Sequence, residues 1–202
     1  MHSENDAYYK RQHLAYSFVC ITGGSLLWIV LSLPLITAGP ATAALYYALA
    51  NSVRRSDGHF LRNFMDCFRR RFKVNSIIGS IFILFSAFLV FCIRFSNLLA
   101  DSQIWLLLSY IYTFFLILLG IIASFLFPLL SRTSGSLWNQ FRVGLLLSFR
   151  YLFTALTCFL VIYLCGMICS KLYALVIFAP SACCLVNSMI LEPVFSRYSF
   201  EE

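Results

Sequence analysis

The stretch LPLITAGPATAAL, residues 33–45, interrupts the first long apolar run of the chain with proline and glycine and then continues in small residues. Pro34 and Pro40 lack the backbone N–H that a continuing helix needs, and Pro40 suits the first turn of a new helix. We therefore predict that one helix ends at this break and that another begins directly after it. Thr37 is expected to satisfy backbone groups that the break leaves without partners, and Gly39 completes the motif.

Composition places the chain among integral membrane proteins. Of its 202 residues, 61% are hydrophobic and 11% are charged, whereas soluble domains carry about 25% charged residues. A helix needs roughly 20 apolar residues to cross the ~30 Å hydrocarbon layer. The fold predicted for residues 1–202 is an all-α, polytopic membrane helix bundle forming a single domain. About five apolar runs reach the required length, and we place the spanning helices at residues 14–34, 74–95, 104–130, 151–170 and 172–191.

Basic residues in the short loops set the predicted orientation. They gather in residues 54–73 and 131–150, so both stretches are predicted to lie in the cytoplasm. An odd number of spans, with the N-terminus outside and the C-terminus cytoplasmic, fits this charge bias. Residues 41–53 leave an alternative open, because if they also cross the membrane the N-terminus moves inside. At ~1.5 Å per residue they reach only about 20 Å, which favours a short broken, re-entrant or interfacial helix.

Arg150 is the charge whose depth the sequence leaves open, because apolar residues flank it on both sides. If the fourth helix begins near Val143, Arg150 lies about two turns inside it and needs a partner. If the helix begins near Tyr151, the guanidinium reaches the cytoplasmic interface. We favour the second start.

The segment HFLRNFMDCFRRRFK, residues 59–73, has the clearest helical periodicity in the chain. Its phenylalanines recur at every fourth residue and therefore share one helix face, opposite a basic face. We predict a cytoplasmic amphipathic helix that lies on anionic lipid, with its aromatic rings in the acyl boundary. A docking surface for a partner protein is the alternative. The residues assigned to lipid or partner contact are Phe60, Phe64, Phe68, Phe72, Arg69, Arg70, Arg71 and Lys73.

The sequence offers no constellation for catalysis or for binding a cofactor. Its eight acidic residues fall in predicted tails and loops or, for Glu192, at the inner end of the last helix. No phosphate-binding loop or zinc-helix motif occurs, so we expect neither an enzyme nor a metal or cofactor site. The net charge of +7 follows from the cytoplasmic charge bias, and nucleic acid is not an expected partner.

Cysteines are numerous, at eight in the chain, and most fall inside predicted helices. There a cysteine behaves as a small apolar residue, which is the interpretation we favour. Palmitoylation, metal binding and redox roles stay open.

The order of these segments resembles the YesL family of bacterial membrane proteins, a family without an assigned activity. The resemblance rests on SLPLITAGPATAALYYAL at the end of the first helix, FLRNFMDCFRRRFKVNSIIGS after it, and FLFPLLSR at the end of the third long helix. It implies a protein of the bacterial cell membrane. It also implies a link to carbohydrate uptake, because members are encoded near carbohydrate ABC importers and their sensor kinases. It implies no catalytic residues.

Three functional hypotheses follow from different classes of protein. The first is a noncatalytic accessory or regulatory protein that packs against an ABC permease or a membrane sensor kinase, using the amphipathic helix and the face carrying Ser76, Gly79 and Ser80. The second is a small solute transporter or channel, alone or as a homo-oligomer, with broken-helix ends near Pro180 and the proline-rich break along its path. The third, a membrane-embedded enzyme, has the least support, because acids and histidines do not share one depth.

Overall fold

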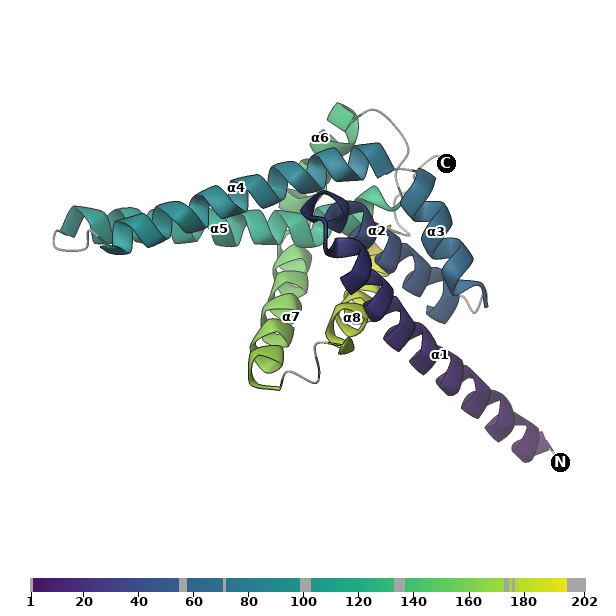
Figure 1. The fold of residues 1–202 in the computed structure, drawn as a ribbon. Helices are drawn as coiled ribbons and strands as arrows, with labels where there is room; N and C mark the ends of the chain where they lie inside the picture. Colours follow the sequence, from purple (N-terminus) through teal and green to yellow (C-terminus); the bar gives the residue numbers. More distant parts are fainter. Residues whose placement is uncertain are drawn as a thin grey trace.

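The computed structural model describes residues 2–54, 58–70, 72–98, 103–132, 137–172, 175 and 177–195. Arg71, which the sequence assigns to the basic contact surface, lies outside these residues. Every regular element in the described ranges is helical (Figure 1). In chain order the elements are α1 (His2–Ser32), the 3-10 turn η1 (Leu35–Thr37), α2 (Ala38–Leu49), the π-helical segment η2 (Ala50–Arg54), α3 (Phe60–Arg70), α4 (Phe72–Leu98), α5 (Gln103–Leu130), α6 (Leu137–Arg150), α7 (Leu152–Lys171) and α8 (Ala179–Phe195).

Within the described residues, three helices, α4, α5 and α7, are long and apolar enough to cross a membrane. α4 has 27 residues and α5 has 28, and at ~1.5 Å per residue each reaches about 40 Å, more than the ~30 Å hydrocarbon core. Two shorter apolar segments, Tyr16–Ser32 and Ala179–Val194, accompany them. The predicted all-α fold class is therefore confirmed for the described residues, with three helices that could cross a membrane.

α2 lies at the centre of the molecule. Nine of its twelve residues are buried, and it contacts α1, α3, α4, α5 and α8. Its alanines are small enough for neighbouring helices to approach closely on several sides. The segment predicted as a short interfacial helix over residues 41–53 is thus a helix that starts earlier, at Ala38, and that other helices enclose.

α3 turns its aromatic face toward this centre. Phe60 and Phe64 are 7% and 0% exposed, and both pack in a cluster with Leu45 and Leu49 of α2. The prediction that these two rings enter the acyl boundary or meet a partner is wrong, because the chain itself covers them. Phe68 is partly buried against the same cluster.

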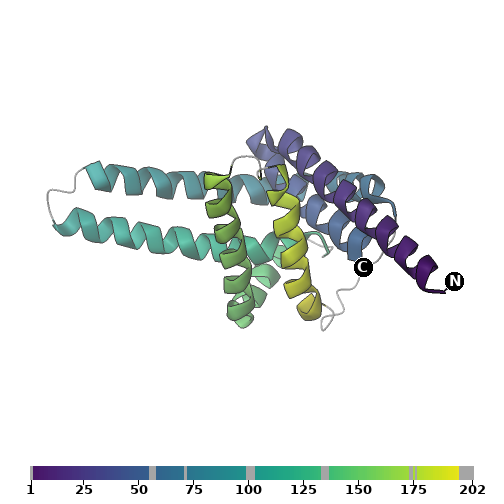
Figure 2. The ribbon, with the colours of Figure 1, turned by 90° about the horizontal axis from the view of Figure 1, so that it is seen from below.

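α4 and α5 form a long antiparallel hairpin that extends away from the remaining helices (Figure 1). α7 and α8 pack beside each other, and in both views they run across the direction of the hairpin (Figures 1 and 2). At the inner end of the hairpin, Ile78 and Phe82 of α4 pack against Leu126 and Leu130 of α5. The three candidate spans therefore do not share one direction.

Several boundaries differ from the predicted ones. The first helix runs over residues 2–32 rather than 14–34, and the last begins at Ala179 rather than at 172. Pro180 explains the later start, because a proline in the first turn of a helix lacks an N–H that would have no partner there anyway. The predicted loop over residues 131–150 contains α6, which ends at Arg150, and α7 starts at Leu152 as favoured.

Candidate functional site

The proline-rich break forms a compact turn between α1 and α2. Pro34 is extended, with φ −75° and ψ 115°, and η1 follows it. Thr37 Oγ1 hydrogen-bonds the carbonyl of Leu31 and, at 2.7 Å, the carbonyl of Pro34. Pro40 lies in the first turn of α2, where it is buried. The predicted role of Thr37, satisfying carbonyls at the break, is confirmed.

Gly39 and Gly79 bring the backbones of α2 and α4 into direct contact. A Cβ at position 39 would lie 2.4 Å from the Asn75 carbonyl oxygen, and a Cβ at position 79 would lie 2.8 Å from Gly39 Cα. Beside this contact, Ser76 Oγ donates a hydrogen bond to the Ile36 carbonyl at 2.8 Å. The helix face with Ser76 and Gly79, which the sequence offered as a contact surface for a partner, therefore packs within the chain.

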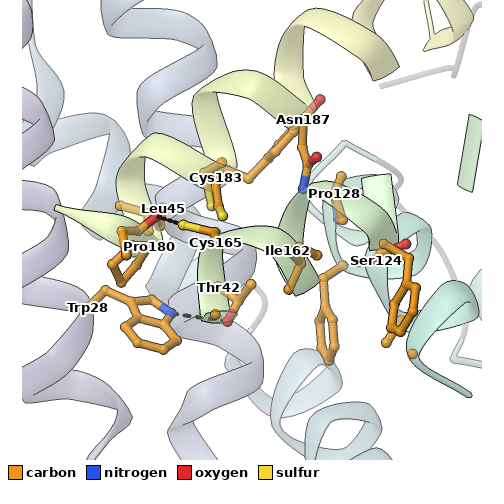
Figure 3. A pocket seen from close by; sticks show the side chains of 18 of the residues that line it. Trp28, Thr42, Leu45, Ser124, Pro128, Ile162, Cys165, Pro180, Cys183 and Asn187 are labelled. Atoms are coloured by element: carbon orange, nitrogen blue, oxygen red, sulfur yellow. Dashed lines mark hydrogen bonds between the residues drawn. The ribbon is translucent and has the colours of Figure 1, made fainter. Parts of the chain in front are cut away.

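A pocket of about 540 Å³ lies where α1, α2, α5, α7 and α8 meet (Figure 3). Most of its lining is apolar or sulfur-bearing, with Trp28 on α1, Leu45 on α2, Ile162 and Cys165 on α7, and Pro180 on α8 among the contributors. Its size falls within the ~300–1,000 Å³ of ordinary small-molecule sites. An apolar cleft of this kind with a few polar groups is the first place to look for a ligand.

Polar side chains on the pocket wall are mostly bonded within the protein. Trp28 Nε1 donates to Thr42 Oγ1 at 3.1 Å, and Thr42 Oγ1 donates to the Ala38 carbonyl at 2.7 Å. Ser124 Oγ bonds the carbonyls of Ile121 at 2.8 Å and Ala155 at 3.2 Å. These groups have little capacity left for a solute.

Tyr46 and Asn187 are the exceptions on that wall. Both are buried, at 1% and 5% exposure. Tyr46 Oη and Asn187 Oδ1 have no hydrogen-bond partner within the described ranges. Burial, followed by the nearby Glu192 carboxylate, raises the pKa of the Tyr46 phenol above its ordinary value, so the group stays a neutral hydroxyl.

Two polar links tie distant parts of the chain together around α2. Arg132, after α5, forms an ion pair with Glu192 of α8, and each side chain is 17% exposed. Ser25 Oγ of α1 donates to Ser181 Oγ of α8 at 2.8 Å, and both serines are fully buried. Sequence reasoning missed both links, because each joins residues far apart in the chain.

Thiols line one side of the pocket. Cys165 and Cys169 of α7 and Cys183 and Cys184 of α8 all belong to its lining, and Figure 3 shows the Cys165 sulfur directed along the dashed line to a backbone carbonyl. The Sγ of Cys165 lies 3.9 Å from the Ala179 carbonyl. No cysteine of the chain forms a disulfide, and the part of the chain that the structure describes has no group of three or more His, Cys, Asp or Glu arranged to hold a metal ion.

The sequence-predicted residues do not converge on the pocket. Pro34, Thr37, Gly39 and Pro40 build the turn that starts α2, and the following part of α2 supplies pocket residues instead. On α3, Arg69 and Arg70 are exposed, as is Lys73 at the start of α4, so a basic surface exists on the far side of the buried phenylalanines. Asn187 escaped notice, although a polar side chain inside an apolar run is a recognised signal of function.

One of the comparisons with known proteins finds a family that part of the chain resembles. A family model described as Protein of unknown function, DUF624, matches residues 21–92. The matched part contains most of α1's apolar half, the break, α2, α3 and most of α4. No curated protein and no solved structure matches the chain.

Proposed function

We propose that the chain belongs to the YesL family and acts as a noncatalytic accessory or regulatory protein in carbohydrate uptake. Its partner would be the permease of an ABC importer or a membrane sensor kinase. Support comes from the match to an uncharacterised family over residues 21–92, which includes the break and α3. Those two segments also carry most of the resemblance to the YesL family.

We propose that α1, α4, α5, α7 and α8 all cross the bacterial cell membrane, with α7 and α8 inclined to the α4–α5 hairpin (Figures 1 and 2), and that the N-terminus lies outside and the C-terminus in the cytoplasm. In this topology five helix ends lie on the cytoplasmic side. They are the end of α1, the start of α4, the end of α5, the start of α7 and the end of α8. The packing supports this, because Phe125 and Leu129 of α5, Ala155 of α7 and Leu191 of α8 meet Tyr46 of α2 in one cluster. The exposed basic residues of α3 then face the inner leaflet, where each basic residue contributes about 1 kcal/mol with anionic lipid.

The observation that carries the accessory role is the extended α4–α5 hairpin. Its outer part leaves large apolar side chains uncovered, among them Phe88 and Phe91 on α4 and Tyr110 and Phe114 on α5. Side-chain packing and hydrogen bonds between helices drive association in a membrane, where apolar area alone contributes little. Ser109 Oγ donates to Asn97 Oδ1 at 2.9 Å within the hairpin itself, so the uncovered apolar side chains are what the hairpin offers for packing. We infer that this hairpin packs against the spanning helices of the partner.

A small solute transporter or channel is the alternative, and the pocket is the observation that favours it. A path for a sugar needs many hydrogen-bonding groups, because each polar group buried without a partner is costly. The wall polar groups of this pocket are largely bonded to the protein itself. We therefore rank the accessory role above transport.

Affinity purification in mild detergent, from cells that produce the importer and the sensor kinase, tests the proposal. We expect a permease or kinase subunit to co-purify with the wild-type chain. The Phe91→Ala/Phe114→Ala variant should recover much less of it, whereas Phe153→Ala, which removes an 84% exposed ring from α7, should recover as much as wild type. If neither subunit co-purifies and purified vesicles instead accumulate a sugar, the transporter alternative replaces the accessory role.

A further inference from the structure

The pocket is set among helices that can reach hydrocarbon. Two of its walls, α5 and α7, are candidate membrane spans, and α1 and α8 supply shorter apolar segments. Its walls carry small residues as well as large ones. Gly166 of α7 is exposed at the lining, and a Cβ placed there would meet nothing within 4 Å. The space beside α7 is therefore open to an occupant rather than filled by side chains.

The chemistry of the wall restricts what that occupant can be. Its Trp28, Thr42 and Ser124 groups are bonded internally, so a sugar or a peptide backbone would lose water hydrogen bonds without replacing them. A hydrocarbon chain loses none. The lining thus fits an apolar chain that carries few polar atoms.

Asn187 indicates where the polar atoms of such a chain would lie. Its side chain is 95% buried, lines the pocket, and makes no hydrogen bond to another described residue. Figure 3 shows its amide nitrogen directed into the pocket, toward the space between Ile162 and Pro128. Oδ1 is the fully buried atom of this amide, whereas Nδ2 faces the pocket without an acceptor among the described residues. An acceptor on the occupant would therefore give Nδ2 the hydrogen bond that it lacks.

We propose that this pocket binds one acyl chain of an ester lipid, with the ester carbonyl accepting a hydrogen bond from Asn187 Nδ2. The acceptor is a neutral ester rather than the carboxylate of a free fatty acid. Arg132 and Glu192, whose charges act on the pocket residue Tyr46, already pair with each other, so they leave a carboxylate in the pocket as an uncompensated buried charge. This inference rests on the pocket and does not depend on the proposed partner.

The test uses the full chain reconstituted in vesicles of phosphatidylethanolamine and phosphatidylglycerol. A trace of the phosphatidylglycerol carries a photoreactive diazirine on one acyl chain, and mass spectrometry locates the cross-links after irradiation. Cross-links to the exposed outer face of α4–α5, around Phe91 and Phe114, report contact with bulk lipid. We expect the pocket segments of α7 and α8 to be labelled well above that reference, and the excess labelling to saturate at one lipid per chain.

Two variants and a matched control make the result decisive. Gly166→Leu adds a side chain in the open space and displaces at least two methylenes of the bound chain, so labelling of the pocket should fall by about tenfold. Gly23→Leu adds the same side chain on α1 where it also meets nothing within 4 Å, away from the pocket lining, and should leave labelling unchanged. Asn187→Leu removes one neutral hydrogen bond and should lower the labelling by about fivefold.

Equal pocket labelling in Gly166→Leu and Gly23→Leu, or labelling no greater than that of the α4–α5 outer face, would overturn the proposal. A second arm replaces the labelled lipid with diazirine-labelled palmitic acid. Preferential labelling of the pocket by the acid, with Asn187→Leu leaving the lipid signal unchanged, would overturn the ester assignment. These measurements need no partner protein, so a negative result would overturn lipid binding without affecting the accessory role. In the same way, a failure to co-purify a partner would not affect lipid binding.

Discussion

Replacing Gly39 by alanine tests the contact on which the centre of the fold depends. The added Cβ would lie 2.4 Å from the Asn75 carbonyl oxygen and 2.9 Å from Gly79 Cα. Both are backbone atoms, so no side chain can turn away to make room. A carbon and a carbonyl oxygen rest at about 3.3 Å or more, and α2 and α4 must therefore separate by about 1 Å.

The cost of that separation can be estimated from the contacts beside it. Overpacking a tight core costs ~1–3 kcal/mol. The Ser76–Ile36 hydrogen bond, at 2.8 Å, spans the same gap, and its loss adds about 1 kcal/mol. We expect Gly39→Ala to lower the free energy of unfolding by roughly 2–4 kcal/mol.

Unfolding in mixed micelles, with dodecyl sulfate as denaturant and helical circular dichroism as the signal, measures this change. Gly23→Ala is the matched control, because a Cβ there meets nothing within 4 Å and alanine is favoured over glycine in a helix by about 0.5–1 kcal/mol. The two variants should therefore shift stability in opposite directions. Gly39→Ala combined with Gly79→Ala should cost less than the sum of the single changes, since both act on one contact. Equal stability of the two alanine variants at 39 and 23 would refute the close contact.

Three further predictions concern the ion pair, the break and the topology. Glu192→Gln should lower the free energy of unfolding by about 2 kcal/mol, a value between those of exposed and buried ion pairs. The double variant Arg132→Met/Glu192→Met should lower that free energy less than the single change does. Both variants are measured by the same denaturation. Thr37→Val should lower the free energy of unfolding by about 1 kcal/mol. Thr113→Val should change it little, because the exposed hydroxyl of Thr113 bonds only the preceding turn of its own helix. Similar losses of stability in both variants would count against a special role for the break. The Arg69→Cys variant should react with an impermeant maleimide in inverted membrane vesicles more strongly than the wild-type chain does, and it should not react in intact cells. Labelling only in intact cells would reverse the proposed orientation.

The apolar runs predicted the long helices well because length and hydrophobicity are local properties. α4 and α5 begin and end within three residues of their predicted bounds. α6 was missed because it is short and carries Arg142 beside an apolar stretch, so it resembles neither a span nor a purely polar loop. The polar residues before position 14 continue α1 without any hydrophobic signal to mark them.

Placement of side chains was harder to predict, because it depends on which helices meet. The period of four showed that Phe60 and Phe64 share a face, but periodicity does not say whether lipid, a partner or α2 covers that face. The pocket could not be read from any single segment either, since five helices contribute to its wall. Asn187 was visible as an amide in an apolar run, yet its significance depends on the space in front of it.

The central position of α2 constrains the order in which the molecule can be assembled during synthesis. α2 leaves the ribosome early, but Leu191, which covers Tyr46, belongs to the last helix. Until α8 has been made, one side of α2 lacks its final neighbour, and the Ser25–Ser181 link cannot close. A nascent chain halted after α7 should therefore expose the side of α2 and α1 that α8 covers.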